Sequence, residues 1–173
     1  LEFRRVLFRS VITPGSQLLP ANSQTLTING TGFSATANLN TVTFSSGSGT
    51  VTSATPNALT VTLNSAPTAG NLTATVVSNS ISSLPAIINT VQPVITANNT
   101  VIDQQTATTI TINGTGFDSD KTKNSVLLSS GAGVVTAASP TQLTVQFTTK
   151  PSVGALLATV TCNNRSEEHT SEL

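Results

Sequence analysis

The sequence predicts an all-β chain in which two copies of one sandwich domain follow each other. Three observations lead to this prediction. A long segment recurs without a gap, aliphatic residues alternate with threonine in both copies, and no stretch has the three-to-four-residue spacing of an amphipathic helix. Period-two alternation is typical of a strand with one buried face, because successive side chains point to opposite faces of a sheet.

The two ends of the chain carry a signal that is unrelated to folding. Residues 165–173 can be back-translated into a DNA string whose opposite strand encodes residues 2–10 in order. No property of a folded protein requires this relation, and the string resembles a translated sequencing adapter. We therefore expect residues 1–10 and 165–173 to be adapter-derived and not native, and residues 11–164 to be the genuine segment. The alternative is a natural basic arm paired with an acidic tail.

The charge of the remaining segment is low and balanced. The single histidine of the sequence lies in the C-terminal flank. The charged side chains of residues 11–164 are three acids and three lysines, namely Asp103, Asp118, Asp120, Lys121, Lys123 and Lys150. A nucleic-acid partner requires a basic face that displaces counterions from phosphates, and three lysines cannot form one. No polybasic segment is present to bind an anionic membrane surface, and no apolar run approaches the roughly 18 residues of a membrane helix.

The composition favours a strand-rich domain outside the cytosol. Threonine, serine, asparagine and valine dominate, tryptophan, tyrosine and methionine are absent, and lysine and glutamate are nearly absent from residues 11–164. The single cysteine, Cys162, excludes an internal disulfide and a multi-cysteine zinc site. We expect an extracellular or cell-surface protein.

The internal repeat has an offset of 84 residues. Thr27–Phe33 (TINGTGF) recurs as Thr111–Phe117, and between residues 24–79 and 108–163 the two copies are identical at 28 of 56 positions. The copies begin alike as well, since Val11-Ile-Thr matches Val94-Ile-Thr with an offset of 83. Two domains follow, at 11–91 and 92–164.

The repeated positions predict the strands. Aliphatic or aromatic residues alternate with threonine in four segments of the first copy, at Leu26 and Ile28, at Val42 and Phe44, at Leu59, Val61 and Leu63, and at Leu72, Ala74 and Val76. A last strand is expected at about 84–91. Six or seven short strands in about 80 residues, with turn residues between them, favour a two-sheet sandwich over a barrel.

The second copy differs from the first at its end. The offset places its last strand at about residues 168–175, where only flanking sequence remains. We therefore expect the second sandwich to lack its last strand, to expose a strand edge and to be the less stable copy.

The ordered set of repeated segments resembles the IPT/TIG family (immunoglobulin-like, plexin, transcription factor). The segments are a V-I-T entry strand, a strand that ends in I-N-G-T-G-F, the following N-x-V-x-F, and the later S-x-T-P-N-x-L-T-V-T and P-T-A-G-N-L-T-A-T-V stretches. The resemblance covers nearly all of residues 11–164. It implies an immunoglobulin-like fold without the cross-sheet disulfide, in a family that includes surface proteins, plexin-like receptors and some transcription factors.

The glycine-rich G-T-G-F segments are expected to be structural turns. A phosphate cradle requires the glycine loop to open a helix, usually with a lysine, and neither follows here. We expect the glycines to supply positive φ in a tight turn and the phenylalanine to close the end of the sandwich. These turn residues are Gly30, Gly32, Phe33, Gly114, Gly116 and Phe117.

Two further features are candidates for a metal site and for a nucleophile. Asp118 and Asp120 form an Asp-x-Asp pair that could begin a Ca²⁺ site, although solvated loop charges explain them better because Ca²⁺ needs six to eight oxygen ligands. Cys162 has the strand parity of Val160, so we expect it to face the core as a small apolar residue, without the base that a nucleophile requires.

No catalytic or cofactor-binding set emerges, so the expected function is structural. We expect a non-catalytic spacer or adhesive module of a larger surface or secreted protein, with neighbouring immunoglobulin-like repeats and an unidentified protein or glycan as partners. Two alternatives remain. One is an accessory domain of a secreted polysaccharide-active enzyme whose catalytic domain lies elsewhere. The other is a DNA-contacting domain of a transcription factor, which the neutral loops disfavour.

Overall fold

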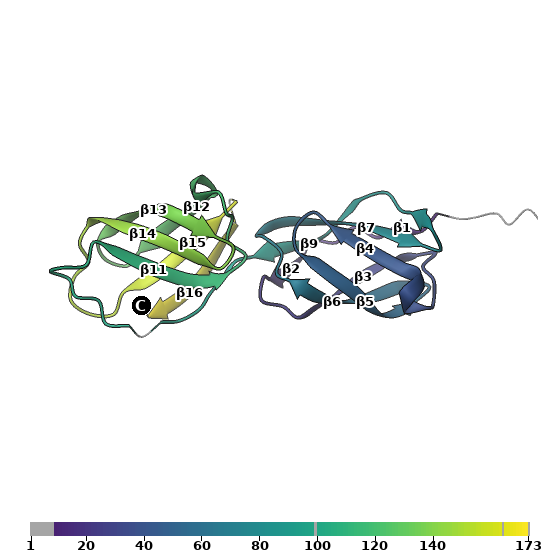
Figure 1. Cartoon of the computed structure of the whole chain (residues 1–173), viewed down its shortest axis with the longest axis horizontal. Helices are drawn as coiled ribbons and strands as arrows, with labels where there is room; N and C mark the ends of the chain where they lie inside the picture. Colours follow the sequence, from purple (N-terminus) through teal and green to yellow (C-terminus); the bar gives the residue numbers. More distant parts are fainter. Residues whose placement is uncertain (1–8, 99, 164, 173) are drawn as a thin grey trace, which may run out of the picture. The chain divides into compact units, whose positions relative to one another are not determined.

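The computed structural model describes residues 9–98, 100–163 and 165–172. The chain forms two compact units, one built from residues up to 19, 23–66 and 71–90, and the other from 20–22, 67–70 and the residues from 91 onward. The described secondary structure is β-strand, apart from two three-residue 3₁₀ turns, η1 (Ala37–Leu39) and η2 (Lys121–Lys123) (Figure 1). Within these residues no helix has the length and apolar character needed to cross a membrane.

The first repeat consists of two sheets. One has the strand order β1 (Val11–Ile12), β3 (Thr25–Thr31), β6 (Ala58–Ser65) and β5 (Ser48–Thr55). The other has the order β2 (Gln17–Pro20), β9 (Ala86–Gln92), β7 (Gly70–Ser78) and β4 (Asn40–Phe44), with β8 (Ile81–Ser82) also paired to β7.

The second repeat uses the same pattern with fewer strands. One sheet has the order β10 (Val94–Ile95), β11 (Thr109–Thr115), β14 (Gln142–Thr149) and β13 (Ala132–Ser139). The other has the order β12 (Asn124–Leu128), β15 (Leu157–Cys162) and β16 (Arg165–Glu172).

The registers of the two repeats coincide. Val42 pairs with Val76 in the first repeat, and Val126 pairs with Val160 in the second. Both repeats also have register shifts at the same two places of the β5–β6 and β13–β14 hairpins. A bulge at one position in both copies is a built-in bend of the strand, because an extra residue locally increases the twist.

The predicted alternation of burial is confirmed. β3 and β11 bury every second residue, and the aliphatic positions of β6, β7, β14 and β15 face the core. In the second repeat the buried core draws on both sheets and comprises Ile95, Ile110, Ile112, Phe117, Leu128, Leu143, Val145, Leu156, Ala158 and Val160. Two sheets that bury one shared aliphatic layer are an immunoglobulin-like sandwich, as predicted.

The end of the second repeat corrects one expectation. We expected this sandwich to lack its last strand, yet β16 pairs antiparallel with β15 from Cys162↔Arg165 to Leu157↔Glu172. The physical reason is that a ladder uses backbone N–H and C=O groups, which every residue except proline supplies, so the open edge of β15 can pair with a segment of any side chains. The sequence of β16, RSEEHTSE, contains no aliphatic residue.

Three strands of the sheets had weak sequence signals. β5 (SGTVTSAT) contains few aliphatic residues, and in β13 (AGVVTAAS) the two valines are adjacent, so the alternation is faint in both strands. β2 is short and ends at Pro20. In the second repeat the corresponding residues, about 100–104, form no strand.

Candidate functional site

The turn after β3 and β11 contains one glycine that needs a left-handed backbone. Gly32 has φ of 76° and Gly116 has φ of 82°, as expected for these positions. A residue with a Cβ adopts this conformation at a cost, so the turn explains why glycine occupies both sites.

The first glycine of each turn has a different role from the one expected. Neither Gly30 nor Gly114 has a positive φ. A Cβ on Gly114 would lie 2.5 Å from Cζ of Phe117 and would also meet the carbonyl oxygen of Val94. Gly30 has the same relation to Phe33. These glycines therefore provide space for the buried phenylalanine ring, which packs against the backbone at the turn.

A buried asparagine holds the loop after each turn, and the sequence analysis did not single it out. Asn124 Oδ1 accepts the N–H of Asp118 (3.1 Å), and its Nδ2 donates to the carbonyl oxygens of Asp118 (2.7 Å) and Asp120 (3.0 Å). The sequence does carry a signal for this asparagine. Asn40 and Asn124 are identical across the 84-residue offset, although the loop directly before them differs between the two copies.

Asp118 is engaged within the protein. Its Oδ1 accepts the N–H of Asp120 (2.9 Å), and its Oδ2 accepts Asn163 Nδ2 (3.0 Å) and lies 3.6 Å from Lys123 Nζ. Burial raises the pKa of this carboxyl group, but these hydrogen bonds and the lysine charge outweigh it, so the pKa is lowered overall.

Asp120 caps the short turn η2. Its Oδ1 accepts both the N–H (3.0 Å) and the hydroxyl (2.7 Å) of Thr122, and the hydroxyl bond is the main reason that the pKa of Asp120 is lowered. Both aspartates thus fix the loop through internal donors. Among the described residues, no three His, Cys, Asp or Glu side chains gather in a cluster that could hold a metal ion. A Ca²⁺ site at Asp118 and Asp120 stays a prediction.

Cys162 faces the core, as its strand parity predicts. The residue is fully buried and has a free thiol, whose Sγ lies 3.7 Å from the carbonyl oxygen of Gly116. Burial raises the pKa of the thiol, so the nucleophilic thiolate is disfavoured.

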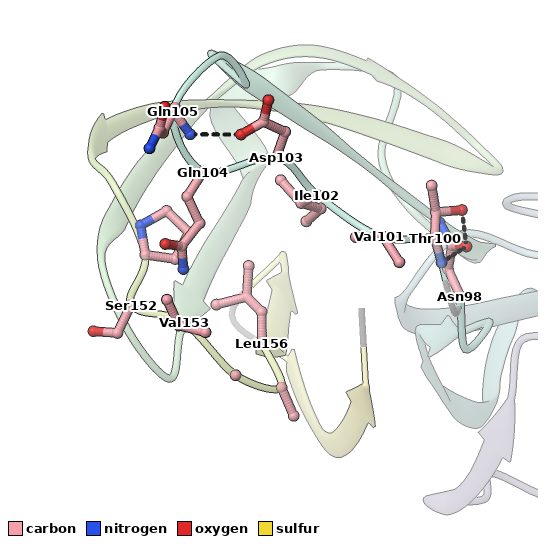
Figure 2. A pocket seen from close by; sticks show the side chains of 13 residues that line it. Asn98, Thr100, Val101, Ile102, Asp103, Gln104, Gln105, Ser152, Val153 and Leu156 are labelled. Carbon is pink, nitrogen blue, oxygen red and sulfur yellow. Dashed lines mark hydrogen bonds between the residues drawn. The ribbon is translucent and has the colours of Figure 1, made fainter.

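The second repeat contains a hollow of about 770 Å³ that sequence analysis did not predict. It lies between the segment 98–105 and the segment 151–156, and Figure 2 shows side chains of both segments bordering it, among them Ile102 and Leu156. Its apolar lining comes from Val101, Ile102, Pro151, Val153, Ala155 and Leu156.

The segment 98–105, which borders the hollow, is held in place by polar contacts. Asp103 accepts the N–H of Gln105 (2.9 Å) and the hydroxyl of Thr106 (2.7 Å), and the bond from Thr106 is the main cause of its lowered pKa. Lys150 Nζ donates to the carbonyl oxygens of Gln104 (3.0 Å) and Gln105 (2.6 Å). Among the described residues that line the hollow, Asp103 is the only charged one.

Both repeats match one known domain type. Residues 10–91 and residues 86–172 both match the IPT/TIG domain. The chain belongs to the IPT/TIG family. The two matches account for both repeats, so the resemblance seen in the sequence is confirmed.

Solved structures with similarity to this IPT/TIG pair include two of a surface-layer protein. Domains 4–9 of the surface-layer protein SbsC share 14% identity with a TM-score of 0.34, and the alignment covers 94% of this chain but only 30% of that one. Domains 5–6 of SbsC share 12% identity with a TM-score of 0.25, covering 89% of each chain. No curated protein matches the sequence.

Proposed function

We propose that this IPT/TIG pair is a non-catalytic structural module, a spacer or adhesive segment of a larger surface or secreted protein. The proposal rests on which positions have the same residue in both repeats. The shared residues include buried aliphatic positions, the turn glycines with their phenylalanine, and the buried asparagine at the loop. Duplicated positions of this kind maintain a sandwich and perform no chemistry.

The polar side chains that could carry chemistry are held in contacts within the protein or are buried, which supports the same proposal. Asp118 and Asp120 hold a loop, Asp103 and Lys150 hold another, and Cys162 is buried. From Val11 to Gln92 the sequence contains no ionisable side chain at all. A neutral surface of threonine and serine favours a spacer or a weak protein or glycan contact, and it disfavours DNA, whose binding depends on neutralising phosphates.

The first experiment is mechanical. The chain is tethered between two handles and stretched, and a spacer is expected to unfold in two separate steps, each releasing about 27 nm for a repeat of about 80 residues. A single gradual extension without a force peak would contradict a load-bearing role.

The second experiment addresses the alternative partners. The purified chain is applied to glycan and extracellular-protein arrays and to immobilised duplex DNA at low salt. Retention on DNA that is lost as salt increases would favour the transcription-factor alternative and overturn the proposal. Recovery of the parent reading frame with an adjoining polysaccharide-active domain would favour the accessory-domain alternative.

A further inference from the structure

Two loop segments of the first repeat belong to the second unit, and one of them is hydrogen-bonded there. These segments are residues 20–22 and 67–70. The N–H of Ala69 donates to the carbonyl oxygen of Gly116 (2.9 Å), and the carbonyl oxygen of Ala69 accepts Asn163 Nδ2 (3.1 Å). The turn of the second repeat and this asparagine thus bind both backbone polar groups of Ala69.

The loop and the turn that binds it cover each other. Ala69 is 4% exposed, and Pro67 and Gly116 are buried. A Cβ on Gly116 would lie 2.5 Å from Cβ of Ala21 and 3.5 Å from the carbonyl oxygen of Pro67. Glycine at this position therefore allows both loop segments to approach the turn, in addition to supplying its positive φ.

The first repeat has the same turn and the same asparagine, but there they are exposed. Gly32 and Asn79 are the counterparts of Gly116 and Asn163 across the 84-residue offset. Their backbones match, since φ is 76° at Gly32 against 82°, and 49° at Asn79 against 50°. In both repeats the N–H of the asparagine donates to the carbonyl oxygen of the last residue of the 3₁₀ turn (3.0 Å). The surface is formed in both repeats, yet Gly32 and Asn79 are exposed where Gly116 is buried and Asn163 is half-buried.

We propose that the Gly32 carbonyl group and the Asn79 amide form a docking site for another IPT/TIG repeat, joined in series, which inserts a loop of the Pro-Thr-Ala-Gly type. The chain itself identifies this partner, because Pro67–Gly70 is such a loop and occupies the equivalent surface of the second repeat. The loop is recognised through backbone N–H and C=O groups beside small side chains, so the ligand is uncharged. The inference rests on the proposed structural function and names its partner.

The second repeat carries the loop half of the same contact. Residues 151–154, PSVG, correspond to residues 67–70, and Gly154 has φ of 130° where Gly70 has φ of 125°. Val153, the counterpart of Ala69, is 91% exposed. One repeat therefore exposes the docking surface and the other exposes the docking loop, as head-to-tail contacts between successive repeats require.

A covalent connection is part of the proposal. Two hydrogen bonds and a few small side chains bind weakly between free molecules, whose stable interfaces bury about 1,200–2,000 Å². Joining the repeats raises the effective concentration of the loop to roughly millimolar values, which compensates for the small contact.

The test adds one repeat to the whole chain. A copy of residues 11–93 is inserted directly before Val11, and hydrogen exchange is followed by mass spectrometry in peptides that contain Ala69. One slowly exchanging population is expected, because both copies of the Ala69 amide are then hydrogen-bonded. Two equal populations, one slow and one fast, would overturn the proposal, since only the loop ahead of Gly116 would be bound. A single fast population would overturn it as well.

Substitutions on the docking surface complete the design. Asn79→Ala, made only in the repeat that follows the insert, removes the donor to the loop carbonyl group. It is expected to speed exchange at least about tenfold in half of the Ala69 population. Thr27→Ala is the control, because Thr27 is exposed in the middle of β3, and it should leave the exchange unchanged. Equal effects of the two substitutions would contradict the assigned surface.

A third substitution should strengthen the contact. Asn163 Nδ2 also donates to Asp118 Oδ2 (3.0 Å), and Ser34 takes the place of Asp118 in the first repeat. Ser34→Asp supplies this acceptor to Asn79 and is expected to slow exchange of the docked Ala69 amide. Faster exchange would contradict the equivalence of the two surfaces.

The design separates docking from the proposed function and from association of free copies. Three separate unfolding steps under force without the added protection would overturn docking and leave the spacer role intact. In the original chain, protection of residues 151–154 that grows with protein concentration would assign the surface to a second copy and overturn the arrangement in series.

Discussion

Asn40 and Asn124 lie 84 residues apart in the sequence, and each side-chain amide makes the same three hydrogen bonds to the loop that precedes it. Asn40 accepts the N–H of Ser34 (3.0 Å) and donates to the carbonyl oxygens of Ser34 (2.8 Å) and Thr36 (3.0 Å). In the second repeat Asp118 and Asp120 take the places of Ser34 and Thr36. The loop sequence changes between repeats while the asparagine that shapes its backbone does not.

Replacing this asparagine should cost stability in either repeat. Asn40→Ala removes all three bonds. The N–H of Ser34 keeps its bond to Ser78 Oγ (2.9 Å), but the carbonyl groups of Ser34 and Thr36 lose their donor, so the free energy of unfolding is expected to fall by about 1–2 kcal/mol. Denaturant titration measures the change. Asn38→Ala, at an exposed position of the same loop, is the control and should change it by less than about 0.5 kcal/mol.

The two turn glycines should respond differently to substitution. Gly30→Ala is expected to destabilise the first repeat by about 1–3 kcal/mol, because its Cβ meets the carbonyl oxygen of Val11 and the Phe33 ring, and Phe33→Leu should relieve only the part of this cost that comes from the ring. Gly32→Ala is penalised by its φ of 76° instead, so Phe33→Leu should not relieve it. A double-mutant cycle measures both couplings, and equal coupling energies would contradict the distinction.

The thiol of Cys162 should report unfolding of the second repeat. The side chain is fully buried and burial raises its pKa, so a thiol reagent is expected to label it at the rate at which the repeat opens. Pulsed labelling with and without denaturant measures this rate. Labelling of the native chain as fast as that of an unfolded peptide would show that the thiol is accessible.

Acid should weaken the second repeat and leave the first unchanged. Asp103, Asp118 and Asp120 each have a pKa lowered from the ordinary 3.8, so the stability they contribute is complete above about pH 4 and is lost as the pH falls through their folded values. The first repeat has no ionisable side chain between Val11 and Gln92 and provides an internal control. Calorimetry at pH 7 and pH 2.5 should show one transition that shifts downward and one that stays.

Much of the fold could be predicted from the sequence because its strongest signals are physical ones. Leu26, Ile28, Leu59 and Val61 alternate with threonine, and each of the four is buried. Because the same pattern recurs 84 residues later, the two copies are expected to have the same architecture. β5 could not be located in this way, since its position depends on pairing with β6 through backbone groups that every sequence has.

The hollow and the asparagine contacts could not be predicted. The hollow is lined by Ile102 and Leu156, which come from segments far apart in the sequence. It also depends on the absence of a strand at residues 100–104, and whether a strand forms there depends on the backbone groups that a neighbouring strand offers. The role of Gly30 was also assigned wrongly, because a lack of space for a Cβ leaves no mark in sequence that distinguishes it from a requirement for positive φ.

The central claim is that the two IPT/TIG repeats are the same sandwich, and that the second is less completely closed because a polar strand occupies the place of β9. Hydrogen exchange on the intact chain, resolved to single strands by mass spectrometry, tests this directly. The account predicts that amides of β15 exchange at least about tenfold faster than those of β7, which corresponds to about 1.4 kcal/mol of opening free energy. Equal protection of β7 and β15 would contradict it.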